Sequence, residues 1–236
     1  MSQEHPSEAP AEPELGGRLA RVRAEIAEAC RAAGREDEPE LIVVTKFHPA
    51  EMVRELHALG ERAFGESRHP EARDKRAEAG ELEGARWHFI GQIQTKKARQ
   101  IARYADAIHS IDRAGLVEAL ATAEVERPID ALIQIDLTGD PARGGCPPAE
   151  AQALADLVAG TPTLRLRGVM AVAPLGGDPA AAFERVAAAG ERIRADHPDA
   201  GWRSIGMSGD FREAIRFGAT HLRIGAAITG MRPVRA

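Results

Sequence analysis

The sequence is short of several features that mark special classes of protein. Its 236 residues include only two cysteines, Cys30 and Cys146, whose separation matches no metal-binding spacing and which form no disulfide framework. No apolar run approaches the roughly 20 residues that cross a bilayer, and the N-terminus has no basic region followed by an apolar one. These absences predict a protein of the reducing cytoplasm, away from the membrane.

An excess of positive charge is also missing. Lysine and arginine total 31 against 36 aspartate and glutamate residues, and aromatic residues make up only 4% of the chain. Such a chain lacks the basic field and the stacking surfaces that nucleic-acid binding uses, so no nucleic-acid partner is expected. The basic segment 96–103, KKARQIAR, is therefore interpreted as a solvated helix face, with a local protein contact as the alternative.

The N-terminal end differs in composition from the rest. Residues 1–15, MSQEHPSEAPAEPEL, combine proline and glutamate with few apolar side chains, which is typical of a disordered tail. We expect one domain over residues 16–232. It opens with a lead-in helix, because Leu19, Val22 and Ile26 recur at helical spacing.

Short apolar runs then alternate with helical patterns along the chain. Eight runs are candidate strands, at residues 41–45, 62–66, 87–91, 107–111, 131–137, 166–172, 202–207 and 221–225. Eight strand–helix units predict an α/β fold, a single (βα)8 barrel of the TIM type with no second β domain. An open doubly wound sheet ranks second, because the first strand–helix turn lacks the glycine fingerprint of a dinucleotide site.

The first candidate strand ends at Lys46, within the segment VVTKFHP. Functional residues of such barrels gather at the C-terminal ends of the strands. A lysine that loses its hydration there can act as a neutral amine, attack a carbonyl and form a Schiff base. From position alone, an ion pair between Lys46 and a carboxylate such as Glu66 is an equally good interpretation.

Two further features follow the last two candidate strands. Ser208 and Gly209 precede a helical pattern, and the helix N-terminus after strand seven is a frequent phosphate site in barrels. Ser208 is also a good N-cap, so capping its own helix is the alternative. In the last strand Arg223 either reaches the barrel mouth or makes a surface pair, and Gly225 permits close approach of a ligand to the backbone.

Together, a carbonyl-trapping lysine, a phosphate cradle and a facing arginine indicate one cofactor, pyridoxal 5'-phosphate (PLP). An arginine beside the pyridine nitrogen keeps that nitrogen unprotonated. The ring is then a weaker electron sink than it would be beside a carboxylate. Such a site holds the cofactor but limits its chemistry.

The sequence closely resembles the pyridoxal phosphate homeostasis protein family, whose fold is like the barrel domain of alanine racemase. The resemblance covers about residues 17–230 through VVTKFHP (43–49), FGES (64–67), WHFIGQIQTKKAR (87–99), HSIDR (109–113), LRGVMAV (166–172), IGMSGDFREAI (205–215) and LRIGAAITG (222–230). It implies that Lys46 carries an internal aldimine and that Arg223 faces the ring nitrogen. It also implies that Ser208 and the backbone around Gly225 and Ala226 hold the phosphate.

Three positions depart from the family pattern: Ser67 and Lys96, where the family has asparagine, and Thr229, where it has phenylalanine. Serine reaches less far than asparagine and offers fewer hydrogen-bonding groups, so no cofactor contact is carried over to Ser67. His88 and His109 are interpreted as hydrogen-bonded core histidines, and no metal site is expected.

The resemblance implies a monomeric PLP-binding protein without catalytic turnover, which takes part in intracellular PLP homeostasis and hands PLP to PLP-dependent apoenzymes. An amino-acid racemase is the alternative; it needs the lysine and a second base on opposite faces of the substrate. The only tyrosine, Tyr104, lies in a helical pattern after the third candidate strand. A cofactor-free Schiff-base aldolase ranks third, because the sequence identifies no carboxylate for Lys46.

Overall fold

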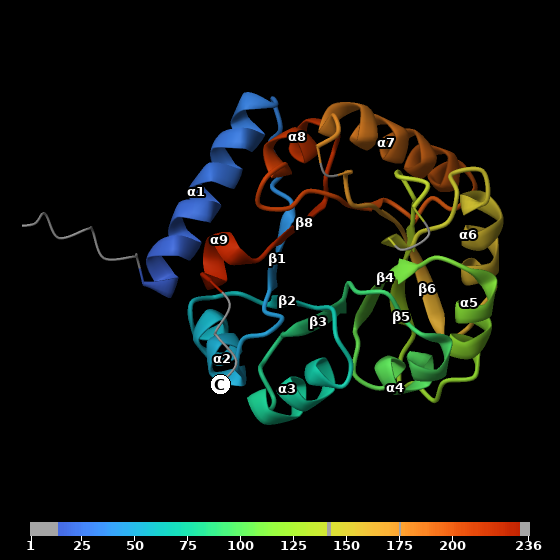
Figure 1. Ribbon diagram of the computed structural model, residues 1–236, viewed down its shortest axis with the longest axis horizontal. Coiled ribbons are helices and arrows are strands. Elements are labelled where there is room, and N and C mark those ends of the chain that lie inside the picture. The colour runs from blue at the N-terminus through green and yellow to red at the C-terminus, as the bar shows by residue number, and fades with distance from the viewer. Residues whose placement is uncertain (1–13, 141–142, 175, 232–236) are drawn as a thin grey trace, which may run out of the picture.

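Eight parallel strands close into a barrel in the computed structural model of the protein, which describes residues 14–140, 143–174 and 176–231 (Figure 1). The strands are β1 Glu40–Val44, β2 Ala63–Glu66, β3 Arg86–Phe89, β4 Ala107–Ile111, β5 Ile129–Gln134, β6 Leu164–Met170, β7 Trp202–Ser204 and β8 His221–Ile224. They follow one another around the barrel in sequence order, and β8 pairs with β1. The predicted (βα)8 barrel is confirmed, and all eight strands belong to this one sheet.

Helices alternate with the strands and form the outer ring seen in Figure 1. They are α1 Leu15–Ala32, α2 Ala50–Ala58, α3 Glu71–Ala79, α4 Ala98–Ala102 after the 3-10 turn η1 Thr95–Lys97, α5 Ala114–Ala121, α6 Ala151–Ala159, α7 Pro179–Asp196, α8 Phe211–Arg216 and α9 Ala226–Thr229. In the part of the chain that the structure describes, none of them has the length and apolar character needed to cross a bilayer.

The lead-in helix α1 lies outside the barrel against α8 and α9 (Figure 1). Leu19 and Val22 are buried on its inner face, as the helical spacing predicts. The helix begins at Leu15, whose side chain is also buried, so the predicted tail over residues 1–15 extends one residue too far. Residues 1–13 of that tail lie outside the described part of the chain.

The outward faces of the strands form the main apolar core. Val43, Phe64 and Ile108 are fully buried between the sheet and the surrounding helices. Burial of each such side chain stabilises the fold by about 1.5–3 kcal/mol relative to its exposure. Continuous apolar runs are therefore expected in these strands, since parallel barrel strands are covered on both faces.

Polar side chains occupy part of the barrel interior. Nδ1 of His109 on β4 lies 2.9 Å from Oγ of Ser204 on β7, and its Nε2 lies 2.9 Å from Nδ1 of His88 on β3. Because β4 and β7 are not neighbours in the sheet, the bond between His109 and Ser204 crosses the interior. The interpretation of both histidines as hydrogen-bonded core residues is confirmed.

Burial sets the protonation of these two rings. It lowers the pKa of His88 to about 3 and holds the pKa of His109 well below its ordinary value. Both rings are therefore neutral near pH 7. Between the ordinary histidine pKa and these lowered values, the unfolded chain binds protons that the folded chain rejects, so stability falls as the pH falls through this window.

We expect the substitution His88→Asn to flatten this pH dependence, because asparagine is polar but does not titrate. Between pH 7 and pH 4 the wild type should lose about 3 kcal/mol more unfolding free energy than the variant. Urea unfolding at the two pH values measures this difference. Parallel losses in the two proteins would mean that His88 is protonated in the folded state at pH 4.

Candidate functional site

A cavity of about 350 Å³ opens at the C-terminal ends of the strands, between β1 and the last two strand–helix connections. All five residues that the sequence analysis selects line it: Lys46, Ser208, Arg223, Gly225 and Ala226. They come from opposite ends of the chain and meet because β8 closes the barrel against β1. The structure thus brings the predicted residues to one place, at the end of the barrel where such folds carry their sites.

Lys46 is half-buried in the turn that follows β1. Among the described residues, no carboxylate lies within ion-pair distance of its amine. Glu66 instead pairs with Lys75 on α3, with 2.5 Å between Oε1 and Nζ. The alternative that Lys46 serves as the partner of Glu66 is therefore wrong, and the amine of Lys46 borders the cavity without a fixed counter-ion.

Arg223 points into the barrel from β8 and is buried. Its Nη1 donates to the carbonyl oxygen and to Oγ of Ser204, each at 2.6 Å, and its Nη2 donates to the carbonyl oxygen of Ala171 at 2.8 Å. Burial lowers its pKa to about 10, which leaves the guanidinium charged near neutrality. The alternative of a surface ion pair is wrong, because neutral oxygens fix the group at the wall of the cavity.

The bonds of Arg223 also connect with those of the interior histidines. Ser204 Oγ accepts from Arg223 and lies 2.9 Å from Nδ1 of His109. Nε2 of His109 lies in turn 2.9 Å from Nδ1 of His88. A continuous hydrogen-bonded chain therefore runs from the buried histidines to the guanidinium at the cavity.

Ser208 and Gly209 form an exposed turn between β7 and α8. Asp210, not Ser208, precedes the first residue of α8, and its Oδ1 accepts the N–H of Met207 at 2.6 Å. The prediction that Ser208 caps this helix is therefore wrong. The backbone N–H groups of Ser208 and Gly209 have no acceptor within the described residues, so both are available to a ligand in the cavity.

Gly225 and Ala226 lie at the junction between β8 and the short helix α9. The carbonyl oxygen of Gly225 accepts the N–H groups of Ile228 and Thr229, which fixes this junction. The three atoms nearest to a Cβ built on Gly225 would all belong to Val44, at ordinary contact distance. Gly225 and Ala226 both line the cavity, as expected for a backbone that a ligand approaches closely.

Several lining residues were not selected from the sequence. His48 is buried beside the cavity, and burial lowers its pKa. Met207 and Thr229 also line the cavity, next to Ser208 and Ala226. Their closeness in the sequence to the selected residues could have identified them as lining residues. Ser67 is not among the residues that line the cavity.

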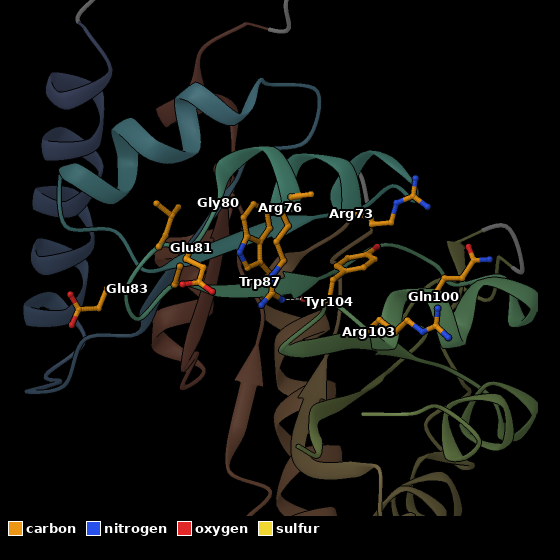
Figure 2. Close-up of a pocket in the computed structure, with 12 residues that line it drawn as sticks. Arg73, Arg76, Gly80, Glu81, Glu83, Trp87, Gln100, Arg103 and Tyr104 are labelled. Atoms are coloured by element: carbon orange, nitrogen blue, oxygen red, sulfur yellow. Dashed lines mark hydrogen bonds between the residues drawn. The ribbon is translucent and has the colours of Figure 1, made fainter. Parts of the chain in front are cut away.

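A larger cavity of about 1110 Å³ lies elsewhere, on the outer side of β3 between α3 and α4. Figure 2 shows Arg73, Arg103 and Tyr104 around it, with none of the five selected residues. Tyr104 is almost fully buried, and its hydroxyl lies 3.3 Å from Nδ1 of His69. The single tyrosine of the chain is thus outside the cavity that holds Lys46.

Comparison with known proteins agrees with this geometry. Residues 18–233 match the model of the family described as alanine racemase, N-terminal domain. A protein of Mycobacterium leprae named pyridoxal phosphate homeostasis protein is 40% identical over 95% of each chain. This chain belongs to the pyridoxal phosphate homeostasis protein family. A protein of Corynebacterium glutamicum with the same name is 42% identical over 84% of this chain and 93% of its own.

Solved structures that are similar to this chain share the barrel. PipY of Synechococcus elongatus, solved with PLP bound, is 32% identical, with a TM-score of 0.80 over 92% of this chain and 100% of its own. Alanine racemase from Corynebacterium glutamicum is 19% identical, with a TM-score of 0.65, and the match covers 93% of this chain but only 62% of the racemase. The racemase likeness shows the fold alone.

Glycine at position 206 shapes the turn that carries Ser208. Its φ is 93°, and an added Cβ would lie 2.7 Å from Cβ of Ala214 and 2.8 Å from Cδ2 of Leu222. We expect Gly206→Ala to lower the unfolding free energy by about 2–4 kcal/mol, through backbone strain and overlap. Gly201→Ala is the control, because nothing lies within 4 Å of its added Cβ. Equal stability of the two variants in urea unfolding would contradict this account.

Proposed function

We propose that this protein binds PLP in the cavity at the barrel mouth, holds it covalently through Lys46 and so takes part in PLP homeostasis. The observation that carries the proposal is the convergence of three groups on one cavity of about 350 Å³. These groups are an amine without a counter-ion, a turn with free N–H donors and a fixed guanidinium. The names of the relatives and the PLP bound to PipY support the same ligand.

Lys46 supplies the nucleophile. PLP offers an aldehyde carbon to which a neutral amine adds; the carbon–nitrogen double bond forms as the carbonyl oxygen leaves in water with the two amine protons. Because no carboxylate holds the Lys46 ammonium in the described structure, deprotonation of the amine breaks no ion pair. The linkage is reversed by water, which suits storage and release.

The phosphate group fits the opposite part of the cavity wall. The N–H groups of Ser208 and Gly209 and the hydroxyl of Ser208 offer donors to phosphate oxygens. The backbone at Gly225 and Ala226 also lines the cavity, with no side chain on Gly225 and only a methyl group on Ala226. We assign these four residues to the phosphate, in the arrangement that barrels use after strands seven and eight.

Arg223 is assigned to the ring nitrogen. Three hydrogen bonds to Ser204 and Ala171 fix the guanidinium, so its charge does not move when a ligand enters. A cation beside the pyridine nitrogen disfavours protonation of that nitrogen, and the ring then withdraws electrons weakly. The cavity therefore favours holding PLP over using it for bond cleavage on an amino acid.

The arrangement favours a carrier over either enzyme alternative. The ionisable side chains that line the cavity are Lys46, His48 and Arg223, and the tyrosine that would serve a racemase as a second base lies in the other cavity. An aldolase would need a carboxylate beside Lys46, and the described structure has none there. We propose that the protein acts as a cytoplasmic monomer without catalytic turnover and passes PLP to apoenzymes.

The first test is the absorption spectrum of the purified protein with added PLP, before and after borohydride, followed by peptide mapping. We expect a band that borohydride traps on Lys46, and we expect Lys46→Ala to lose it entirely while its unfolding midpoint stays unchanged. Lys96→Ala, at an exposed lysine, is the matched control and should behave as the wild type. Label spread over surface lysines would overturn the proposal.

The same preparation separates the carrier from the racemase. Loaded protein is incubated with single L-amino acids, and the D-enantiomer is measured by chiral chromatography. We expect no conversion above that of free PLP. Conversion that Lys46→Ala abolishes would replace the carrier with the enzyme alternative.

A further inference from the structure

The backbone immediately after Lys46 is strained. Phe47 has a φ of 70°, and it is the only non-glycine residue with positive φ in the described residues. The N–H of His48 donates to the carbonyl oxygen of Thr45 at 3.0 Å, so Lys46 and Phe47 are the central residues of a tight turn. The second central position of such a turn with positive φ favours glycine or asparagine. A phenylalanine stays there only if its surroundings hold it.

Side chains from α3 and β2 hold both neighbours of Lys46. Glu71 Oε1 accepts the N–H of Phe47 at 2.6 Å. Lys75 Nζ donates to the carbonyl oxygen of Thr45 at 2.7 Å, the same oxygen that closes the turn. Glu66 Oε1 accepts from the hydroxyl of Thr45 at 2.7 Å and from Lys75.

We infer that Glu71 and Lys75 are positioning residues, which hold the strained turn so that the amine of Lys46 is aimed into the cavity. The inference rests on the proposed function, because the step that this positioning would assist is the capture of an aldehyde by Lys46. The residues before and after Lys46 are fixed, whereas its own side chain makes no ion pair in the described structure. The turn therefore restricts the direction of the side chain and leaves its amine free to react.

Burial makes the holding contacts rigid. Lys75 and Glu66 are 5% and 2% exposed, and both members of a buried pair must stay together, because separating them leaves an uncompensated charge. Glu71 is the first residue of α3, and Lys75 follows it by one helical turn. Nζ of Lys75 lies 3.7 Å from Oε1 of Glu71. The start of α3 thus presents both groups to the turn from one rigid element.

The test compares Glu71→Ala with Glu71→Gln, which keeps an oxygen that can accept the N–H of Phe47. We expect Glu71→Ala to lower the equilibrium constant for covalent capture of PLP by Lys46 about tenfold. Glu71→Gln should stay within about twofold of the wild type. Binding of 4'-deoxypyridoxine 5'-phosphate, which has no aldehyde, should be unchanged in both, because the phosphate and ring contacts remain.

A second, independent experiment removes the backbone strain at Phe47. In the Phe47→Gly background the left-handed conformation has no steric cost, so adding Glu71→Ala should lower capture by less than about threefold. Phe47→Gly alone is the reference for this step, because it also removes a ring from the cavity wall. Glu78→Ala, at an exposed residue of the same helix, should match the wild type.

Lys75 is tested together with its partner, so that no buried charge is left unpaired. Lys75→Met combined with Glu66→Gln should lower capture by at least the factor seen for Glu71→Ala, with the deoxy analogue again unaffected. Loss of analogue binding in step with capture would mean that the cluster only supports the fold. That result would overturn the inference.

Amide hydrogen exchange in the ligand-free protein separates this inference from the proposed function. Exchange of the Phe47 amide should accelerate about tenfold in Glu71→Ala and remain at the wild-type rate in Glu78→Ala. Unchanged exchange, or equal capture by Glu71→Ala and the wild type, would overturn the positioning role. Absence of capture on Lys46 in the wild type, with Phe47 exchange behaving as expected, would overturn the proposed function and leave the positioning role supported.

Discussion

The pairing of β1 with β8 is the contact on which the candidate site depends. Their register places Ile42 beside Arg223 and Val43 beside Ile224, so the strand leading to Lys46 lies along the strand that carries the arginine. No local interaction joins these segments, which stand at opposite ends of the domain. Only closure of all eight strands brings them together, and the cavity exists because the barrel is complete.

Arg223 connects the site to the core of the barrel. A buried guanidinium costs several kcal/mol in lost hydration unless its donors are satisfied. Here two carbonyl oxygens and one hydroxyl accept from it, and that hydroxyl continues the chain to His109 and His88. The neutral histidines add no positive charge next to the arginine. The polar side chains of the barrel interior therefore have a structural role as well as a role in the candidate site. They fix the direction of the Arg223 guanidinium.

The sequence predicted most of what periodicity and strand order determine. Each of the eight apolar runs overlaps a strand, and Lys46, Ser208 and Arg223 meet at the strand ends as the barrel topology requires. The wrong predictions concern which of two candidate residues takes a given role. Asp210 and Ser208 are both good caps two positions apart, and the backbone path decides between them. The partner of Glu66 could not be predicted from the sequence. Lys75 of helix α3 comes within ion-pair distance of Glu66 only when α3 packs on the sheet.

A site that stores a reactive aldehyde has requirements different from those of an enzyme. It needs one amine in the right direction, a phosphate contact for affinity and a ring environment that does not promote bond cleavage. In the proposed function, the strained turn beside Lys46 would meet the first requirement, because it would fix direction without a counter-ion on the amine. A carboxylate close to the amine would also order the lysine, but it would compete with the aldehyde for the amine. On the positioning inference, the pairing of Glu66 with Lys75 would therefore serve both ends: Lys75 holds the backbone beside Lys46, and Glu66 is kept from the Lys46 amine.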